Sequence, residues 1–151
     1  MSVLAAIRPD SWNFPLLLHV LGAMILVGGT LTGASALAFA RGTAPILRLG
    51  YYSLLAVALP GWVLMFASAH WIYSKEGLDE GAIESAWIAI GFVVAEAGGV
   101  LLLISLVLGG IGMRRLKSGR GSGLLKATLV ISLLLIAAYV VAIWAMSGKP
   151  D

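Results

Sequence analysis

The sequence predicts an all-α integral membrane protein, a four-helix bundle that runs up-down-up-down with both termini outside the cell. Of its 151 residues, 60% are hydrophobic and only 11% are charged. A soluble domain of this size cannot bury so much apolar surface, because its volume limits its core. The chain also contains four apolar runs long enough to cross a bilayer. No segment is left over for a soluble domain, so residues 1–151 are expected to form a single membrane domain with the lipid bilayer around it.

The predicted spans cover residues 14–40, 47–73, 86–113 and 124–146. At about 1.5 Å per residue, each can cross a hydrocarbon layer of about 30 Å. The sequence Ala38-Phe39-Ala40 resembles a signal-peptide cleavage site. The region before the first span has little net positive charge, however, and the apolar run is longer than a signal core. We therefore expect the first span to stay in the protein.

Proline, glycine and hydroxyl residues mark the ends and the middle of the spans. Thr43 is expected to cap the second span, with Pro45 in its first turn. Pro60-Gly61 falls in the middle of that span and predicts a kink, because proline removes one backbone hydrogen bond. Ser122 is expected to cap the fourth span and Gly148 to end it.

The orientation follows from the positive residues, which are retained on the cytoplasmic side. The loop after the second span carries Lys75 beside four acids. The other two loops carry seven cations: Arg41, Arg48, Arg114, Arg115, Lys117, Arg120 and Lys126. We therefore expect a multi-pass protein of the bacterial inner membrane with these basic loops in the cytoplasm. Topology accounts for the net charge of +3, and no nucleic-acid partner is expected.

Small residues lie along one face of two spans. In the first span they are Gly22, Gly29, Gly33 and Ala36, and in the third they are Gly91, Ala95, Gly98, Ser105, Gly109 and Gly112. Small side chains let helix backbones approach closely in a membrane. These faces predict tight packing inside the bundle. Where such a face lies on the outside, it predicts a membrane protein partner or a homo-oligomer.

Two histidines lie within or at the end of apolar spans. His19 shares the glycine face of the first span, so its imidazole is expected to face other helices. His70 lies near the outer end of the antiparallel second span, at a similar depth. Two imidazoles at one depth can ligate an iron or copper ion. Two structural alternatives remain: His70 sits among lipid head groups, or His19 is a core histidine bonded to a threonine or a backbone carbonyl.

Glu96 is the only acid within the apolar part of a span. It is expected about 15 Å below the outer surface, where an ionised carboxylate is costly. We therefore expect it to be buried and either neutral or paired, with Tyr139 of the fourth span at the same depth. In a structural role, a protonated Glu96 bonds to Tyr139 or to a backbone carbonyl. In a functional role, it serves as a proton-transfer or ligand-contacting acid beneath a site formed by His19.

Several chemistries are excluded or unsupported by residue content. The chain has no cysteine, which excludes disulfides, thiolate metal sites and thiol catalysis. It has no HExxH motif, no phosphate-binding glycine loop and no hydrolase triad, so no catalytic residue is assigned and an enzyme is not the favoured interpretation. Met24, Met65 and Met146 offer thioethers that bind Cu(I), but methionine also fills apolar cores. No metal other than a haem iron is predicted.

Four fragments carry a resemblance to known proteins: LLHVLGAMILVGG, PGWVLM, HWIYSKEGL and WAMSGKP. Together they resemble a family of four-helix bacterial, and especially actinobacterial, integral membrane proteins of unknown function. That family is distantly similar to the copper-resistance D-like proteins and to the HemJ-type protoporphyrinogen oxidases. In the HemJ type a first-span histidine is associated with haem ligation, and His19 matches that position. The HemJ type also uses a basic residue within a later span, which is missing here, so the resemblance extends to the bundle and its histidine but not to the oxidase activity.

Three functions follow as alternatives. The first is binding of haem b near the outer leaflet, with His19 as an axial ligand, His70 as the second and Glu96 tuning the site. The second is a structural or accessory subunit of a larger membrane complex, without a cofactor. The third is a copper or small-solute permease. Its polar path would use Glu96, Tyr139, Ser105, Ser132 and Thr30.

Overall fold

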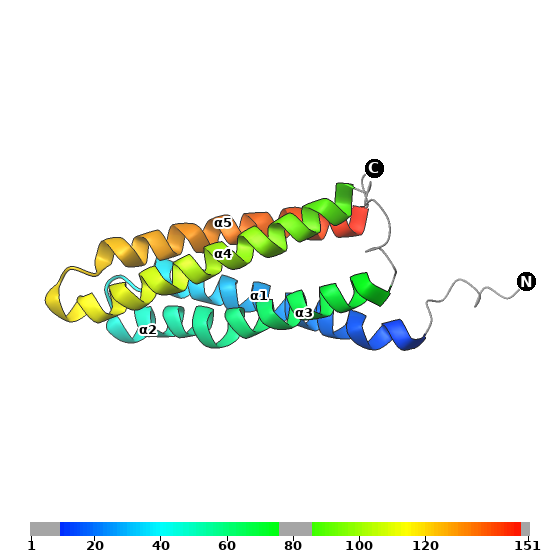
Figure 1. Cartoon of the computed structure of the whole chain (residues 1–151). Helices are drawn as coiled ribbons and strands as arrows, with labels where there is room; N and C mark the ends of the chain where they lie inside the picture. The colour runs from blue at the N-terminus through cyan, green and yellow to red at the C-terminus, as the bar shows by residue number, and fades with distance from the viewer. Residues whose placement is uncertain (1–9, 76–85, 149–151) are drawn as a thin grey trace, which may run out of the picture.

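The computed structural model describes residues 10–75 and 86–148, and this part of the chain is helical except for short connections, with no strand. It forms four long rods (Figure 1). The rods are α1 (Asp10–Phe39), then α2 (Ala44–Ser53) continued by the π-helical η2 (Leu54–Ala58) and by α3 (Leu59–Lys75), then α4 (Ala86–Arg115) with the short 3-10 helix η3 (Leu116–Ser118), and α5 (Ser122–Gly148). The acidic loop and both termini lie outside the described residues.

All four rods are long and apolar enough to cross a membrane, over residues 13–39, 44–75, 86–118 and 122–148. The predicted all-helical class with four long apolar helices is confirmed. The second and third helices run beyond the predicted spans because charged and polar end residues such as Lys75 and Arg115 continue the helix past the apolar run. Only 22–33% of the most apolar window of each helix is buried inside the bundle, so most of the apolar side chains face outward.

Consecutive rods are antiparallel, and they form two layers (Figure 1). One layer contains α1 packed along α2, η2 and α3, and the other contains α4 packed along α5. Contacts between α1 and α5 join the layers, whereas α3 and α4 touch at few positions. Helix α1 begins and α5 ends at the same end of the bundle, where α3 and α4 diverge.

Glycines bring α1 into backbone contact with the second rod. A Cβ atom on Gly29 would lie 2.6 Å from the backbone nitrogen of Ala58, and one on Gly61 would lie 2.5 Å from that of Leu26. Ser53 Oγ donates a hydrogen bond to the Gly29 carbonyl at 3.1 Å. The tight packing predicted for the glycine face of the first span is therefore confirmed, and this face is used inside the chain.

The interruption predicted at Pro60-Gly61 takes the form of a π-helical turn. Helix η2 (Leu54–Ala58) lies directly before Pro60, and the Leu59 N–H bonds to the Leu54 carbonyl five residues back. In a regular α-helix the proline ring would clash with the carbonyl four residues earlier, at Ala56. The wider turn accommodates the ring.

The predicted caps differ in detail from the structure. Thr43 precedes α2 as expected, but its side chain makes no capping hydrogen bond. Ser122 is the first residue of α5 instead of its cap, and the residue before it is Gly121. A Cβ atom on Gly121 would collide with the Gly112 carbonyl, so the close crossing of α4 and α5 requires glycine at this position. Gly148, the residue predicted to end the fourth span, is the last described residue of α5.

Candidate functional site

His19 lies in the seam between α1 and α3. Its half-buried imidazole places Nδ1 3.1 Å from the carbonyl oxygen of Met65 on α3. Because a carbonyl only accepts, Nδ1 carries the proton and donates it, and Nε2 of the neutral ring keeps its lone pair. The prediction that this ring faces another helix is confirmed. The contact is the one described by the structural alternative, a core histidine bonded to a backbone carbonyl.

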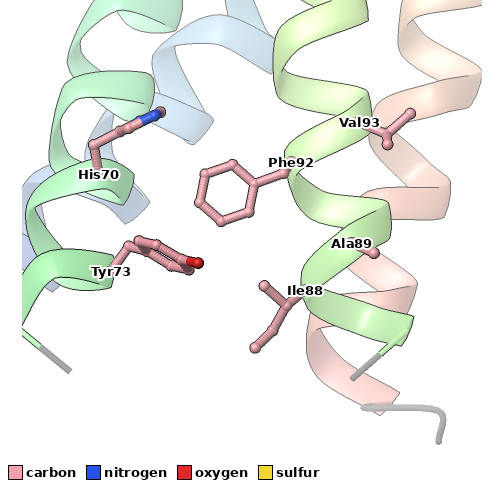
Figure 2. A pocket seen from close by; sticks show the side chains of 6 residues that line it. All are labelled: His70, Tyr73, Ile88, Ala89, Phe92 and Val93. Atoms are coloured by element: carbon pink, nitrogen blue, oxygen red, sulfur yellow. The ribbon is translucent and has the colours of Figure 1, made fainter. Parts of the chain in front are cut away.

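His70 lies on the other side of α3, facing α4 (Figure 2). Its Nδ1 is 3.1 Å from the carbonyl oxygen of Phe66, one turn earlier in the same helix. The imidazole contacts the ring of Phe66 at a centroid distance of 4.3 Å and the edge of Phe92 at 5.5 Å. The carbonyl again holds the proton on Nδ1, so Nε2 is the nitrogen available to a ligand.

A groove between α3 and α4 adjoins His70. The groove is open to the outside and has a volume of about 310 Å³, which is at the lower end of the range for small-molecule sites. The residues that line it are His70, Tyr73, Ile88, Ala89, Phe92 and Val93 (Figure 2). His70, Ala89 and Val93 are exposed, so the groove faces the surroundings of the bundle. It is an apolar and aromatic slot with one imidazole and one phenol.

The two histidines lie at similar height but do not share one site. The carbonyls that hold them belong to consecutive residues, Met65 and Phe66. Consecutive residues differ by about 1.5 Å along a helix and by about 100° around it. The imidazoles therefore lie on different sides of α3. Among residues 10–75 and 86–148, no group of three or more metal-ligating side chains occurs.

The expected Glu96–Tyr139 pair is not formed. Glu96 is exposed on the outside of α4, and none of the hydrogen bonds found among the described residues involves it. Tyr139 is only 5% exposed, and its hydroxyl is buried without a hydrogen-bond partner. A Cβ atom on Gly98 would lie 3.5 Å from the Tyr139 ring, so this ring packs on the Gly98 face of α4. Glu96 is two residues, or about 200°, away from Gly98 around the helix. Counting residues correctly predicted that Glu96 and Tyr139 lie at a similar depth. It gave no information on the direction in which each side chain points around its helix.

The other polar residues of the interior are bonded mainly to backbone. Thr30 Oγ1 donates to the Leu26 carbonyl at 2.7 Å, and Ser132 Oγ donates to the Thr128 carbonyl at 2.9 Å. Ser105 Oγ is buried without a partner in the described part of the chain. With Glu96 outside, these hydroxyls and Tyr139 do not combine with a buried acid.

Sequence reasoning missed the aromatic residues that lie in the groove or on the same helix face beside it. Trp62 Nε1 donates to the Ala95 carbonyl on α4 at 2.8 Å, and its ring stacks on Phe66 at 5.2 Å. Trp62, Phe66 and His70 recur at intervals of four, a spacing that places them on one helix face. This periodicity could have revealed the aromatic face of α3 from the sequence. No pattern in the sequence could have revealed Phe92, because only the tertiary fold brings it to α3.

The fold is that of an all-helical protein with four helices long and apolar enough to cross a membrane, which suggests a multi-pass membrane protein. Comparisons of the chain with protein-family models, with curated proteins and with solved structures return no match. The resemblances drawn from the sequence therefore stay predictions.

Proposed function

We propose that this chain is an integral protein of the bacterial inner membrane that binds haem b in the groove between α3 and α4, near the outer leaflet, with His70 as an axial ligand. One observation carries the proposal: the Phe66 carbonyl holds the proton on His70 Nδ1, which leaves Nε2 free in an apolar, aromatic groove. Ligating histidines characteristically donate their other ring N–H to a carbonyl or carboxylate.

The outward surface supports insertion into a membrane. Large apolar side chains are exposed along every rod, including Met24 at 68%, Val93 at 63% and Val140 at 60%. In water this surface would be an aggregation liability, whereas in lipid it is the expected exterior. The seven cations at one end of the bundle support a cytoplasmic position for that end, because the positive-inside rule retains Lys and Arg there.

The groove residues suit a flat apolar cofactor. Bound haem would supply redox-active iron, whose potential depends on its axial ligands and on the surrounding dielectric. Phe66 and Phe92 would orient the imidazole between their rings and keep water away from it. His19 takes a positioning role, because its bond to Met65 fixes the α3 turn that also presents the Phe66 carbonyl.

An absorption spectrum tests this proposal. The protein is purified in mild detergent from cells supplied with haem, beside the variants His70→Ala, His19→Ala and Trp71→Ala. We expect a Soret band in the parent chain, in Trp71→Ala and in His19→Ala, and its loss in His70→Ala. Loss only in His19→Ala would move the ligand to α1. Colourless parent protein would overturn haem binding altogether.

A second candidate function, an accessory subunit of a membrane complex, is favoured by the position of Glu96. An exposed stripe runs along α4 with alternating steps of four and three residues, through Ala89, Val93, Glu96, Val100, Leu103 and Val107. This is the spacing of a helix-packing seam. A carboxyl group in the middle of a lipid-facing stripe is costly, and a partner helix with a hydrogen-bonding group at that depth would satisfy it.

Cysteine cross-linking tests the second candidate, since the parent chain has no cysteine. Val100→Cys lies on the Glu96 stripe, and Val130→Cys is an equally exposed control on α5. We expect cross-links from position 100 in native membranes, reduced by an added Glu96→Leu change, and none from position 130. A disulfide-linked dimer from position 100 would identify a second copy as the partner. Equal cross-linking at both positions would contradict a specific interface.

A further inference from the structure

The end of the bundle away from the groove carries unbalanced positive charge. Its loops and helix ends hold Arg41, Arg48, Arg114, Arg115, Lys117, Arg120 and Lys126. The acids of the chain are all elsewhere, at positions 10, 76, 79, 80, 84, 96 and 151. These cations therefore have no acidic side chain near them in sequence. Among the described residues Glu96 lies inside α4, away from the loops and helix ends that carry the cations.

A cavity of about 290 Å³ opens at this basic end, between the end of α1, the connection to α2 and the start of α5. Its walls include Leu37, Leu47, Leu125 and Leu129, and its rim includes Arg41 and Lys126. The lining is thus divided into an apolar part and a cationic part. A small soluble anion would use only the cationic rim, and an apolar solute would leave the two charges unmatched.

Local backbone geometry brings the rim together. Arg41 and Gly42 have left-handed φ angles of 44° and 83°, which turn the chain sharply after α1. Arg41 thereby comes to line the same cavity as Lys126, although the two residues are far apart in sequence. Ser122 also lines it, so the positive end of the α5 dipole adds to the potential of the two side chains.

We infer that this cavity binds one anionic phospholipid of the surrounding leaflet. The phosphate lies between Arg41 and Lys126, and part of an acyl chain lies along the leucine wall. A zwitterionic lipid is disfavoured because its own ammonium group would approach a lining whose charged side chains are both cations. The inference rests on the membrane insertion proposed above but not on haem, so a protein without a Soret band leaves it intact.

Native mass spectrometry tests the site. The protein in detergent is offered equal amounts of phosphatidylglycerol and phosphatidylcholine. We expect one retained phosphatidylglycerol, with a preference that falls about 30-fold when Arg41→Gln and Lys126→Gln are combined, because each cation contributes a factor of about five. The matched control combines Arg114→Gln and Arg115→Gln, which remove the same charge at the same end without lining the cavity. An equal loss in both pairs would show diffuse electrostatic attraction and overturn the site.

Two further variants and a soluble analogue distinguish lipid binding from misfolding and from binding of a small anion. Arg41→Lys with Lys126→Arg keeps the charges and should keep the preference, which excludes misfolding as the cause of the loss. Leu129→Trp fills the apolar wall while leaving the rim, and should lower retention of the lipid. Glycerol phosphate, the soluble analogue of the head group, should fail to displace the lipid at equal concentration. Full displacement by glycerol phosphate, or unchanged retention in Leu129→Trp, would overturn the assignment to a lipid.

Discussion

The seams on either side of α3 are built from similarly apolar helices, yet one is closed and the other is open. Against α1, α3 presents Gly61 and α1 presents Gly22, so backbone meets backbone, and Gly29 of α1 continues this close contact along η2. Against α4, α3 presents aromatic rings, and the helices touch at few positions. The side chains at the contact, and not overall hydrophobicity, determine how closely two membrane helices approach.

The same contrast decides what each histidine can do. In the closed seam His19 is half-buried and bonded across the helices to Met65. In the open seam His70 is exposed and its hydrogen bond lies within its own helix, so its only described contact with α4 is the edge of the Phe92 ring. One imidazole therefore contributes to packing, and the other is available to a ligand.

The largest expected effect comes from adding a side chain where α1 is in backbone contact with the second rod and leaves no room for it. Gly29→Ala should lower the free energy of unfolding by about 3 kcal/mol, since its Cβ would meet the Ala58 backbone, which cannot move aside cheaply. Unfolding by sodium dodecyl sulfate in mixed micelles measures this. Gly28→Ala, which meets nothing within 4 Å, is the control and should not destabilise the protein. Equal losses would contradict the described packing.

A smaller loss is expected where Trp62 joins the open seam. Trp62→Phe removes the 2.8 Å hydrogen bond to Ala95 and part of the ring that fills the space beside Gly99. We expect a loss of about 1–2 kcal/mol of unfolding free energy in the same assay. Trp144→Phe, at a side chain that is 60% exposed, provides the control. An unchanged midpoint for Trp62→Phe would mean that α3 and α4 are held by other contacts.

His19 should contribute more than His70 to stability, and His70 should contribute more than His19 to ligand binding. His19→Ala loses an interhelical hydrogen bond, and the expected cost is about 0.5–1.5 kcal/mol. His70→Ala should change unfolding by less than this, because its bond lies within one helix and its ring is exposed. Thermal unfolding beside the Soret measurement checks both rankings. If His70→Ala is the more destabilising change, the division between packing and ligand roles fails.

The smallest expected effect is a gain in stability instead of a loss. Tyr139→Phe removes a buried hydroxyl without a partner and keeps the ring that packs on Gly98. Unfolding free energy should stay constant or rise by up to about 1 kcal/mol, because no hydrogen bond is lost and a desolvation cost disappears. Tyr52→Phe on the surface is the control. A clear loss in Tyr139→Phe would reveal an unseen partner of the hydroxyl.

The architecture could be derived largely from the amino-acid sequence, because span length, apolar runs and proline position are local properties. Four apolar stretches predicted four long helices, and Pro60 predicted the irregular turn of the second rod. The glycine spacing on α1 likewise predicted which face packs, since a helix repeats every 3.6 residues whatever surrounds it.

The candidate site depended on the assembled bundle. Depth along a helix follows from counting residues, but direction around it relative to other helices depends on how all four rods pack. For this reason His19 and His70 lie at similar height on different sides of α3, and Glu96 faces outward while Tyr139 faces inward. The groove beside His70 and the cavity beneath Arg41 exist only because helices distant in sequence converge at one end and diverge at the other.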